Sequence, residues 1–423
     1  MNEVQSTSGL KKLRGNPNAV ISIIAVLLVA ILCQSSGAEN PALEYMAEEF
    51  NYLPMSTITM VTTLPSLMMI PASLAFSWLR TKFSFRPLFV VSAILLIVGG
   101  VMPAFAADFV QVLVWRAIFG LGVGVMWPLA QSLIVELYDG EKQNTMLGWN
   151  SVVTACGGII WQNVGGVLAL SGWRMSFYTY FIPIAVLVFC GIFIPNTLPA
   201  SKKAREEHGI EEDADSASKA EQGYIGLTVL LLIAYFAFNF FSMLYYTNIS
   251  FKIVGENIGE SDLVGITTSM LTLGSLVIGI IFGKMMNLKF FGKYAMCIGW
   301  LLAGFGMLIG GVTMSIPLLF IGGFIQGFGT GTYMPAMVGL IGNVGGKAKA
   351  SVILGISTCV LGASQFFGPT IMNLIVESMG LTNGSPCITM GATCQVICGI
   401  IATIVFVAIK KSREKKAAAT AAE

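Results

Sequence analysis

Charged side chains are scarce in this chain of 423 residues, because Asp, Glu, Lys and Arg together make up only 11% of it. Hydrophobic residues make up 55%, whereas soluble domains contain about 45 to 50%. This excess of apolar residues excludes a water-soluble fold. The formal net charge of +2 gives no bias toward nucleic acid or acidic partners.

Histidine is nearly absent as well, since the only one, His208, lies in a polar stretch between apolar segments. The chain therefore lacks a buried imidazole for catalysis or proton relay. The eight cysteines mostly stand singly inside apolar stretches, which is typical of small buried side chains and not of a disulfide framework. The glycine-rich run 120–125 follows no strand, so it does not indicate a phosphate-binding loop. We therefore predict no enzyme, no cofactor and no metal site.

Long apolar runs dominate the chain, and a helix needs about 20 mostly apolar residues to cross the hydrocarbon core of a membrane. Six runs lie near residues 19–44, 55–79, 86–107, 109–137, 145–170 and 177–195. Six more lie near 224–249, 262–286, 292–313, 316–341, 348–376 and 389–409. The first run follows Lys11, Lys12 and Arg14 and is interpreted as an uncleaved helix, because Leu32 does not fit a cleavage site before Cys33.

This pattern predicts an all-α membrane protein of about twelve transmembrane helices, arranged as two pseudo-symmetric bundles of six. The N-terminal bundle is expected at 1–195 and the C-terminal bundle at 224–409. Residues 196–223 have no apolar face to bury and are predicted to form a cytoplasmic central loop. Residues 410–423 form a basic cytoplasmic tail.

Lysine and arginine predict the orientation, because short cytoplasmic loops carry an excess of both. With the N-terminus in the cytoplasm, nearly all of these residues fall on the cytoplasmic side. Arg174 and Lys252, beyond the ends of their predicted helices, fall on the other side. We therefore predict a multi-pass protein of the bacterial inner membrane with both termini in the cytoplasm.

The two halves of the chain repeat each other. Residues 119–130 of the fourth run match residues 326–337 of the tenth in unbroken register. Three glycines and a proline coincide, namely Gly120, Gly122, Gly124 and Pro128 with Gly327, Gly329, Gly331 and Pro335. Parallel repeats of this kind build transporters from two bundles that rock against each other.

Several short motifs resemble the major facilitator superfamily, and the resemblance covers essentially the whole chain. Gly172, Trp173, Arg174 and Phe177 are similar to its GWRxxF signature. Residues 77–86 occupy the position of its GxLxDRxGRR loop, although Thr81 replaces the aspartate. Arg116, Gly120 and Gly122 resemble its RxxxGxG motif. The resemblance implies a secondary transporter, functional as a monomer, with protons as the default coupling ion.

Arg116 is the clearest charge within an apolar run, where insertion scales put its cost at about 2.5 to 3.5 kcal/mol. Glu39, near the end of the first run, lies at a matching depth, and we predict that the two residues form a pair. One interpretation is a proton-sensitive coupling switch. The others are a static pair that holds two helices together and direct recognition of an anionic substrate by the guanidinium group.

Polar and aromatic side chains at helical spacing form stripes that are unfavourable against lipid and that indicate the walls of a substrate cavity. The candidate substrate-binding residues are Arg116, Trp127, Gln131, Asn150, Thr154, Trp161, Tyr235, Asn239, Tyr246, Gln326, Tyr333 and Gln365. The alternative is that part of these amides and hydroxyls hold helices together by hydrogen bonds.

The expected function is transport of a small organic solute, preferably an organic anion, by alternating access with proton or solute coupling. The expected partners are this substrate, membrane lipid and H⁺, without nucleic acid. Efflux of drugs or amphipathic compounds is the first alternative. A carrier-like membrane sensor that binds a ligand without translocating it is the second.

Overall fold

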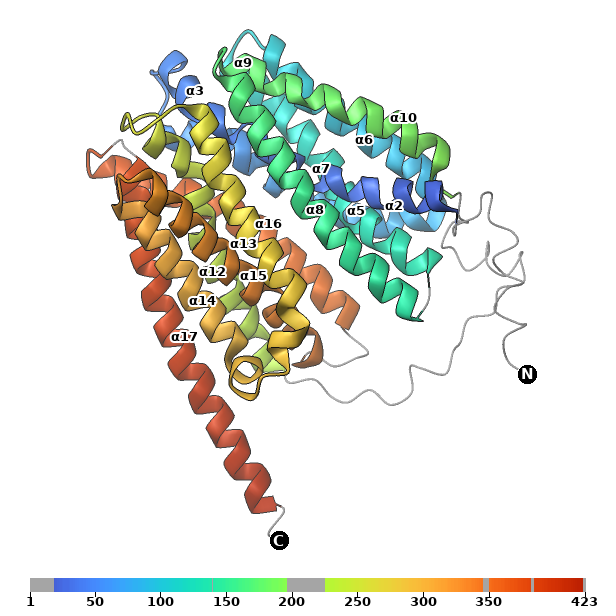
Figure 1. Cartoon of the computed structure of the whole chain (residues 1–423), viewed down its shortest axis with the longest axis vertical. Helices are drawn as coiled ribbons and strands as arrows, with labels where there is room; N and C mark the ends of the chain where they lie inside the picture. The colour runs from blue at the N-terminus through green and yellow to red at the C-terminus, as the bar shows by residue number, and fades with distance from the viewer. Residues whose placement is uncertain (1–18, 139, 196–224, 345–349, 382–383, 421–423) are drawn as a thin grey trace. The chain divides into compact units, whose positions relative to one another are not determined.

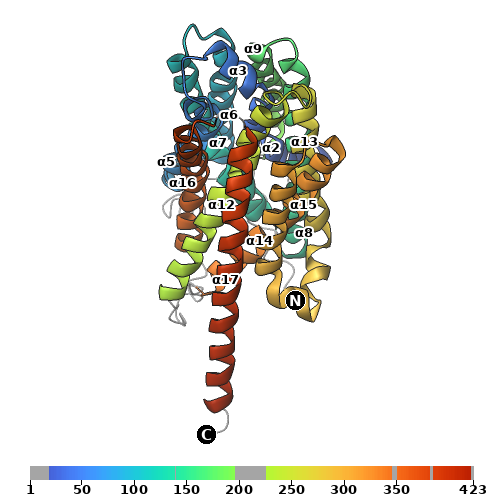
Figure 2. The same cartoon turned by 90° about the vertical axis from the view of Figure 1, so that its left-hand side faces the viewer.

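The computed structural model describes residues 19–138, 140–195, 225–344, 350–381 and 384–420. All regular secondary structure in these residues is helical. The described residues form two compact units, drawn in Figures 1 and 2. Unit 1 contains the described residues up to 195 together with Ile253–Ser269, and unit 2 contains 225–252 and the residues from Met270 onward. The predicted central loop 196–223 with His208 and the last tail residues 421–423 lie outside the described part.

The helices of the first half of the chain belong to unit 1. They are α2 (Val20–Cys33), α3 (Leu43–Glu49), α4 (Met55–Ile58), α5 (Met60–Lys82), α6 (Phe85–Val101), α7 (Phe109–Leu137), α8 (Gly140–Ala169), α9 (Trp173–Ser176) and α10 (Ile182–Phe193). Short 3₁₀ helices join some of them, namely η1 (Ser35–Gly37), η2 (Asn40–Ala42), η3 (Met102–Phe105) and η4 (Phe177–Phe181).

The helices of the second half are longer and less interrupted. They are α12 (Ile225–Ile253), α13 (Ser261–Met286), α14 (Lys289–Val312), α15 (Ile316–Val344), α16 (Ala350–Ser378) and α17 (Gly384–Thr420). The first turns of α13 belong to unit 1, and the rest of this helix belongs to unit 2. Within unit 2, α17 extends well beyond the other helices at its C-terminal end (Figure 2).

Eleven helical segments of the described residues are long and apolar enough to cross a membrane. The remaining predicted span corresponds to α15, a helix of 29 residues in which glycines and Gln326 lower the apolar content. The prediction of an all-α membrane protein with about twelve spans is therefore confirmed.

The first span differs from the continuous helix that its apolar run suggested. α2 ends at Cys33, two 3₁₀ turns follow, and α3 begins at Leu43. Pro41 stands at the start of η2 and lacks the N–H that a continuous α-helix would donate to the carbonyl of Gly37. The break contains Glu39 and Asn40, whose side chains are both fully buried inside unit 1.

The repeated glycines allow close helix packing in both halves. A methyl group added at Gly122 of α7 would lie 2.7 Å from the backbone N of Leu96 in α6. At Gly124 it would lie 2.7 Å from Met69 Cα in α5, so α7 packs tightly against two neighbours. In unit 2, Gly329 and Gly331 of α15 make the same close approaches to α14 and α13. The sequence repeat is therefore a repeat of helix contacts, as expected where small residues let backbones approach.

Two helices of unit 2 are longer than their apolar runs. α12 continues past the predicted end at 249 to Ile253. α17 begins at Gly384 and continues to Thr420, so most of the predicted tail 410–423 is helical.

Candidate functional site

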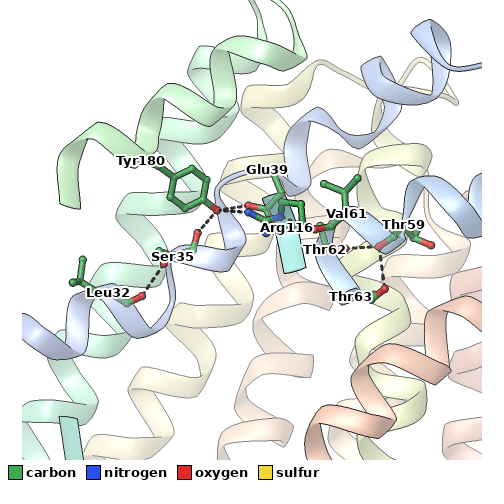
Figure 3. Close-up of polar contacts among 9 residues, drawn as sticks. All are labelled: Leu32, Ser35, Glu39, Thr59, Val61, Thr62, Thr63, Arg116 and Tyr180. Atoms are coloured by element: carbon green, nitrogen blue, oxygen red, sulfur yellow. Dashed lines mark hydrogen bonds and ion pairs between the residues drawn. The ribbon is translucent and has the colours of Figure 1, made fainter. Parts of the chain in front are cut away.

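The centre of unit 1 contains a buried ion pair between Glu39 and Arg116 (Figure 3). Glu39 lies in the broken first span, and Arg116 lies on α7. Both side chains are 0% exposed, and Nη2 of Arg116 donates to Oε1 of Glu39. The predicted pair is therefore present, and its charges compensate each other where no water reaches them.

Two further contacts hold the guanidinium group of Arg116. Its Nε donates to the backbone carbonyl of Val61 at 2.8 Å. Its Cζ lies 4.2 Å from the ring centre of Phe119, one turn along α7. The ring face is the negative side of the aromatic quadrupole and attracts the cation.

The carbonyl of Val61 is available to Arg116 because of a proline. In a regular helix this oxygen would accept from the N–H of residue 65, but Pro65 of α5 has no N–H. Arg116 supplies the missing donor. The same logic applies at Pro128 of α7, whose missing N–H leaves the carbonyl of Gly124 to accept from Ser73 Oγ at 3.0 Å.

Tyr180 of η4 completes the cluster, and the sequence analysis did not single it out. Its hydroxyl oxygen lies 2.5 Å from Oε2 of Glu39 and 2.8 Å from the carbonyl oxygen of Ser35. It also accepts from Nη1 of Arg116 at 3.3 Å. The only signal in the sequence was a hydroxyl within an aromatic segment, three residues after the GWRxxF motif, and this signal does not reveal a partner.

Within unit 1, the predicted cavity residues have different surroundings. Trp161 is fully buried and donates from Nε1 to the carbonyl of Ile31 at 2.7 Å, which ties α8 to α2. Asn150 is buried, Thr154 and Trp127 are partly buried, and Gln131 is exposed. Their role in substrate binding stays a prediction.

The candidates in unit 2 include an aromatic cluster. Tyr333 stacks on Phe238 with ring centres 3.8 Å apart, and Trp300 meets both rings edge-on. Tyr235 and Asn239 are also buried, whereas Tyr246 and Gln365 are partly buried. Asn239 donates to the carbonyl of Tyr235 at 2.8 Å.

Two of the predicted cavity residues of unit 2, Gln326 and Tyr333, have buried polar atoms with unused hydrogen-bonding capacity. Gln326 donates to the carbonyl of Ser242 at 3.3 Å, but its Oε1 accepts no hydrogen bond from the described residues. The hydroxyl of Tyr333 also has no partner there. Buried polar atoms of this kind normally find a partner, so these two are available to a ligand or to water.

The placement of Lys252 beyond the end of its helix was wrong. α12 continues past this residue, and the side chain is 0% exposed. Its Nζ donates to the carbonyl of Gly311 at 2.7 Å and to Ser385 Oγ at 2.6 Å. The apolar run ended at 249, so periodicity alone gave no reason to extend the helix.

Ion pairs at two other places connect helices of unit 1. Arg80 at the end of α5 makes a two-pronged contact with Glu136 of α7, at 2.6 and 2.7 Å. Arg174 of the GWRxxF motif contacts Glu49 of α3 at 2.7 Å, and Trp173 donates to the same carboxylate at 2.7 Å. The second pair is about two-fifths exposed, with side-chain exposures of 39% and 44%.

A sequence model of the Major Facilitator Superfamily matches residues 23–253 and, a second time, residues 231–423. The chain belongs to the major facilitator superfamily. This superfamily consists of membrane transporters and not of enzymes, in agreement with the expectation from the sequence. Its fold accounts for the repeated halves described above.

Curated relatives of this superfamily member match only in part. It is 26% identical over 204 residues to the uncharacterized MFS-type transporter YhcA of Bacillus subtilis, which covers 47% of this chain and 37% of that protein. It is 22% identical over 308 residues to the quinolone resistance protein NorA of Staphylococcus aureus, which covers 71% of this chain and 75% of that protein. The chain thus spans about two-fifths of YhcA and three-quarters of NorA.

Solved structures of the superfamily match nearly the whole chain. The inward-open xylose transporter XylE from E. coli aligns with a TM-score of 0.70 and 14% identity, covering 90% of this chain and 94% of XylE. The POT family transporter PepTSo aligns with a TM-score of 0.70 and 11% identity, covering 92% and 98%. At such low identities the likeness establishes the shared fold.

Proposed function

We propose that this chain is a secondary transporter that moves a small organic anion by alternating access, with Glu39 and Arg116 as its coupling residues. The observation that carries the proposal is a fully buried arginine whose charge is compensated by a group that can be neutralised. Arginine does not release its proton in proteins, whereas a carboxylate can take one up. The charge balance of the site therefore depends on Glu39.

This charge balance suggests how a proton and a substrate are coupled. With Glu39 ionised, the pair is neutral and needs no ligand. With Glu39 protonated, Arg116 is a buried cation without a counter-charge, which is strongly unfavourable. A substrate carboxylate supplies that counter-charge and suits the fork of the guanidinium group. The proposal therefore predicts electroneutral symport of one proton with one monovalent anion.

The proposal also includes the substrate-contacting residues, the two moving bundles and the position of the termini. The candidate residues of both units, including Asn150, Trp161 and Gln326, are proposed to contact the substrate. Residues 1–195 and 224–409 are proposed to act as the two moving bundles of a functional monomer. Both termini are proposed to lie in the cytoplasm, which tag accessibility in intact and opened cells tests directly.

The test is uptake and counterflow of labelled monocarboxylates in proteoliposomes with an imposed pH gradient. Wild-type protein should accumulate the anion when the proton gradient points inward. Glu39→Gln should lose this accumulation yet keep counterflow, because Arg116 still needs an anion. Arg116→Ala should lose anion binding. Glu49→Gln, in the partly exposed pair with Arg174, is the control and should behave like wild type.

Unchanged anion binding by Arg116→Ala would refute the proposed substrate class. In that case efflux of amphipathic aromatic compounds becomes the better candidate. Two observations favour it as the alternative. The aromatic cluster of Phe238, Trp300 and Tyr333 offers flat apolar surfaces, and NorA is named for quinolone resistance. Saturable binding without accumulation of any solute would instead indicate a membrane sensor.

A further inference from the structure

The hydroxyl group of Tyr180 faces two acceptors with a single hydrogen. One acceptor is Oε2 of Glu39 at 2.5 Å, and the other is the carbonyl oxygen of Ser35 at 2.8 Å. A phenol donates one hydrogen bond at a time and accepts through its oxygen, here from Nη1 of Arg116 at 3.3 Å. The hydroxyl can therefore donate either to the side chain of Glu39 or to the backbone carbonyl of Ser35, but not to both at once.

The ring of Tyr180 is held in place, so this choice is a rotation of the hydroxyl hydrogen alone. The side chain is 0% exposed. A methyl group added at Gly100 of α6 would lie 2.5 Å from the ring, which shows how closely α6 packs against it. Phe119 meets the ring edge-on, with centres 5.1 Å apart.

The backbone acceptor lies in the break of the first span. Ser35 begins the 3₁₀ turn η1, and its carbonyl receives the N–H of Ala38 at a long 3.3 Å. A carbonyl with one weak partner gains from a second donor. The donor it receives from Tyr180 therefore stabilises the broken conformation of residues 35–42.

Glu39 is the group that decides where the hydroxyl points. An ionised carboxylate attracts the hydrogen more strongly than a neutral carbonyl does. A protonated carboxyl becomes a donor itself, and the phenol oxygen can accept its hydrogen. The hydrogen of Tyr180 is then free to turn to Ser35.

We propose that Tyr180 is a positioning residue that transmits the protonation state of Glu39 to the broken first span by turning its hydroxyl between Glu39 and Ser35. The proton stays on Glu39, and Tyr180 remains neutral throughout. The proposal deepens the coupling role suggested for Glu39 and Arg116 and rests on it. It makes the backbone at 35–42 more protected when Glu39 is protonated.

The charged and titratable surroundings of Glu39 are simple. Within the described residues it interacts with Arg116 from α7 and Tyr180 from η4. The neighbouring helix α5 presents threonines whose hydroxyls bond to carbonyls of their own segment, such as Thr62 to Thr59. On α3, the carboxyl groups of Glu44 and Glu48 repel each other.

The experiment compares Tyr180→Phe with wild type and with Tyr178→Phe, a control two residues away in the same 3₁₀ helix. Phenylalanine keeps the ring and removes the hydroxyl. Two quantities are measured across pH: amide hydrogen exchange of the peptide covering residues 34–42, corrected for the intrinsic pH effect, and proton-driven anion uptake. Wild type and Tyr178→Phe should gain protection as pH falls. Tyr180→Phe should lose this gain, and its uptake midpoint should shift by about one pH unit, because a hydrogen bond to a charged group is lost.

Exchange and uptake separate the two proposals. If Tyr180→Phe keeps the wild-type exchange and the wild-type uptake midpoint, the role of Tyr180 is refuted while anion transport stands. If wild type shows no proton-driven uptake, the proposed function fails, and the exchange data alone decide the role of Tyr180. Glu39→Gln provides a second test, because its amide does not titrate and should make the protection of residues 34–42 independent of pH. A pH-dependent exchange in Glu39→Gln would overturn the inference.

Discussion

Removing the charges of the buried pair one at a time should have unequal effects. Glu39→Gln leaves Arg116 charged and fully buried, and breaking a buried pair in this way costs about 3 to 5 kcal/mol. Near pH 4.3, about the ordinary pKa of glutamate, Arg116→Met leaves a carboxyl that takes up a proton at little cost. Its main cost there is the unpaired carbonyl of Val61, about 1 to 3 kcal/mol. The double variant keeps only this second cost. The predicted coupling energy is therefore about 3 to 5 kcal/mol.

The effect of Arg116→Met should also depend on pH. A protonated Glu39 in the folded state binds a proton that the unfolded chain releases at neutral pH. Stability then falls as pH rises, by at most about 1.4 kcal/mol per pH unit. Glu39→Gln should lack this dependence, because its remaining buried charge does not titrate.

The assay is unfolding of purified protein in mixed micelles by increasing SDS, followed by loss of helical circular dichroism. The control is the same cycle at the partly exposed pair of Glu49 and Arg174, where an exposed ion pair contributes about 0 to 1 kcal/mol. The reasoning is refuted if Glu39→Gln costs no more than Glu49→Gln, or if the double variant loses the sum of the two single losses.

Three further predictions follow from individual contacts. Pro65→Ala restores an N–H for the carbonyl of Val61, so Arg116→Met should cost about 1 to 3 kcal/mol less in that background in the same SDS assay. Gly122→Ala should cost about 1 to 3 kcal/mol by overpacking α7 against α6, whereas Gly148→Ala, with open space around it, should cost nothing measurable. The amine of Lys252 should resist acylation by small reagents in folded protein and react after SDS unfolding, in a mass-spectrometric readout; equal labelling in both states would contradict its burial.

The helices were predictable because each apolar run is long enough to cross a membrane. The predicted helix ends were wrong where a helix stops inside an apolar run or continues beyond it. The first run looked continuous from 19 to 44, but the effect of Pro41 on a helix depends on what compensates its missing N–H. α12 passed its apolar limit because Lys252 finds acceptors on α14 and α17, Gly311 and Ser385. Contacts between distant residues of this kind have no local signature.

The pair of Glu39 and Arg116 was predictable for a simpler reason. A charge within hydrocarbon requires a counter-charge at similar depth, and few acids were available. Tyr180 was not predictable, because a tyrosine in an aromatic segment fits a membrane helix whether or not its hydroxyl has a partner. Its hydrogen bonds depend on the tertiary contact between η4 and the break in the first span, where Ser35 lies 145 residues away in the sequence.

From its composition and its repeats alone, the chain is committed to a membrane, to helices, and to two similar halves, since a lipid solvent permits few other ways to satisfy the backbone. Tertiary structure alone decided which side chains donate hydrogen bonds to the backbone carbonyls that lack a helical N–H donor. Pro65 leaves an acceptor wherever it stands, but only the packing of α7 on α5 brings Arg116 to it. Hydrogen bonds act over about 3 Å, and the distances that matter at this site are set by helix packing and not by sequence spacing.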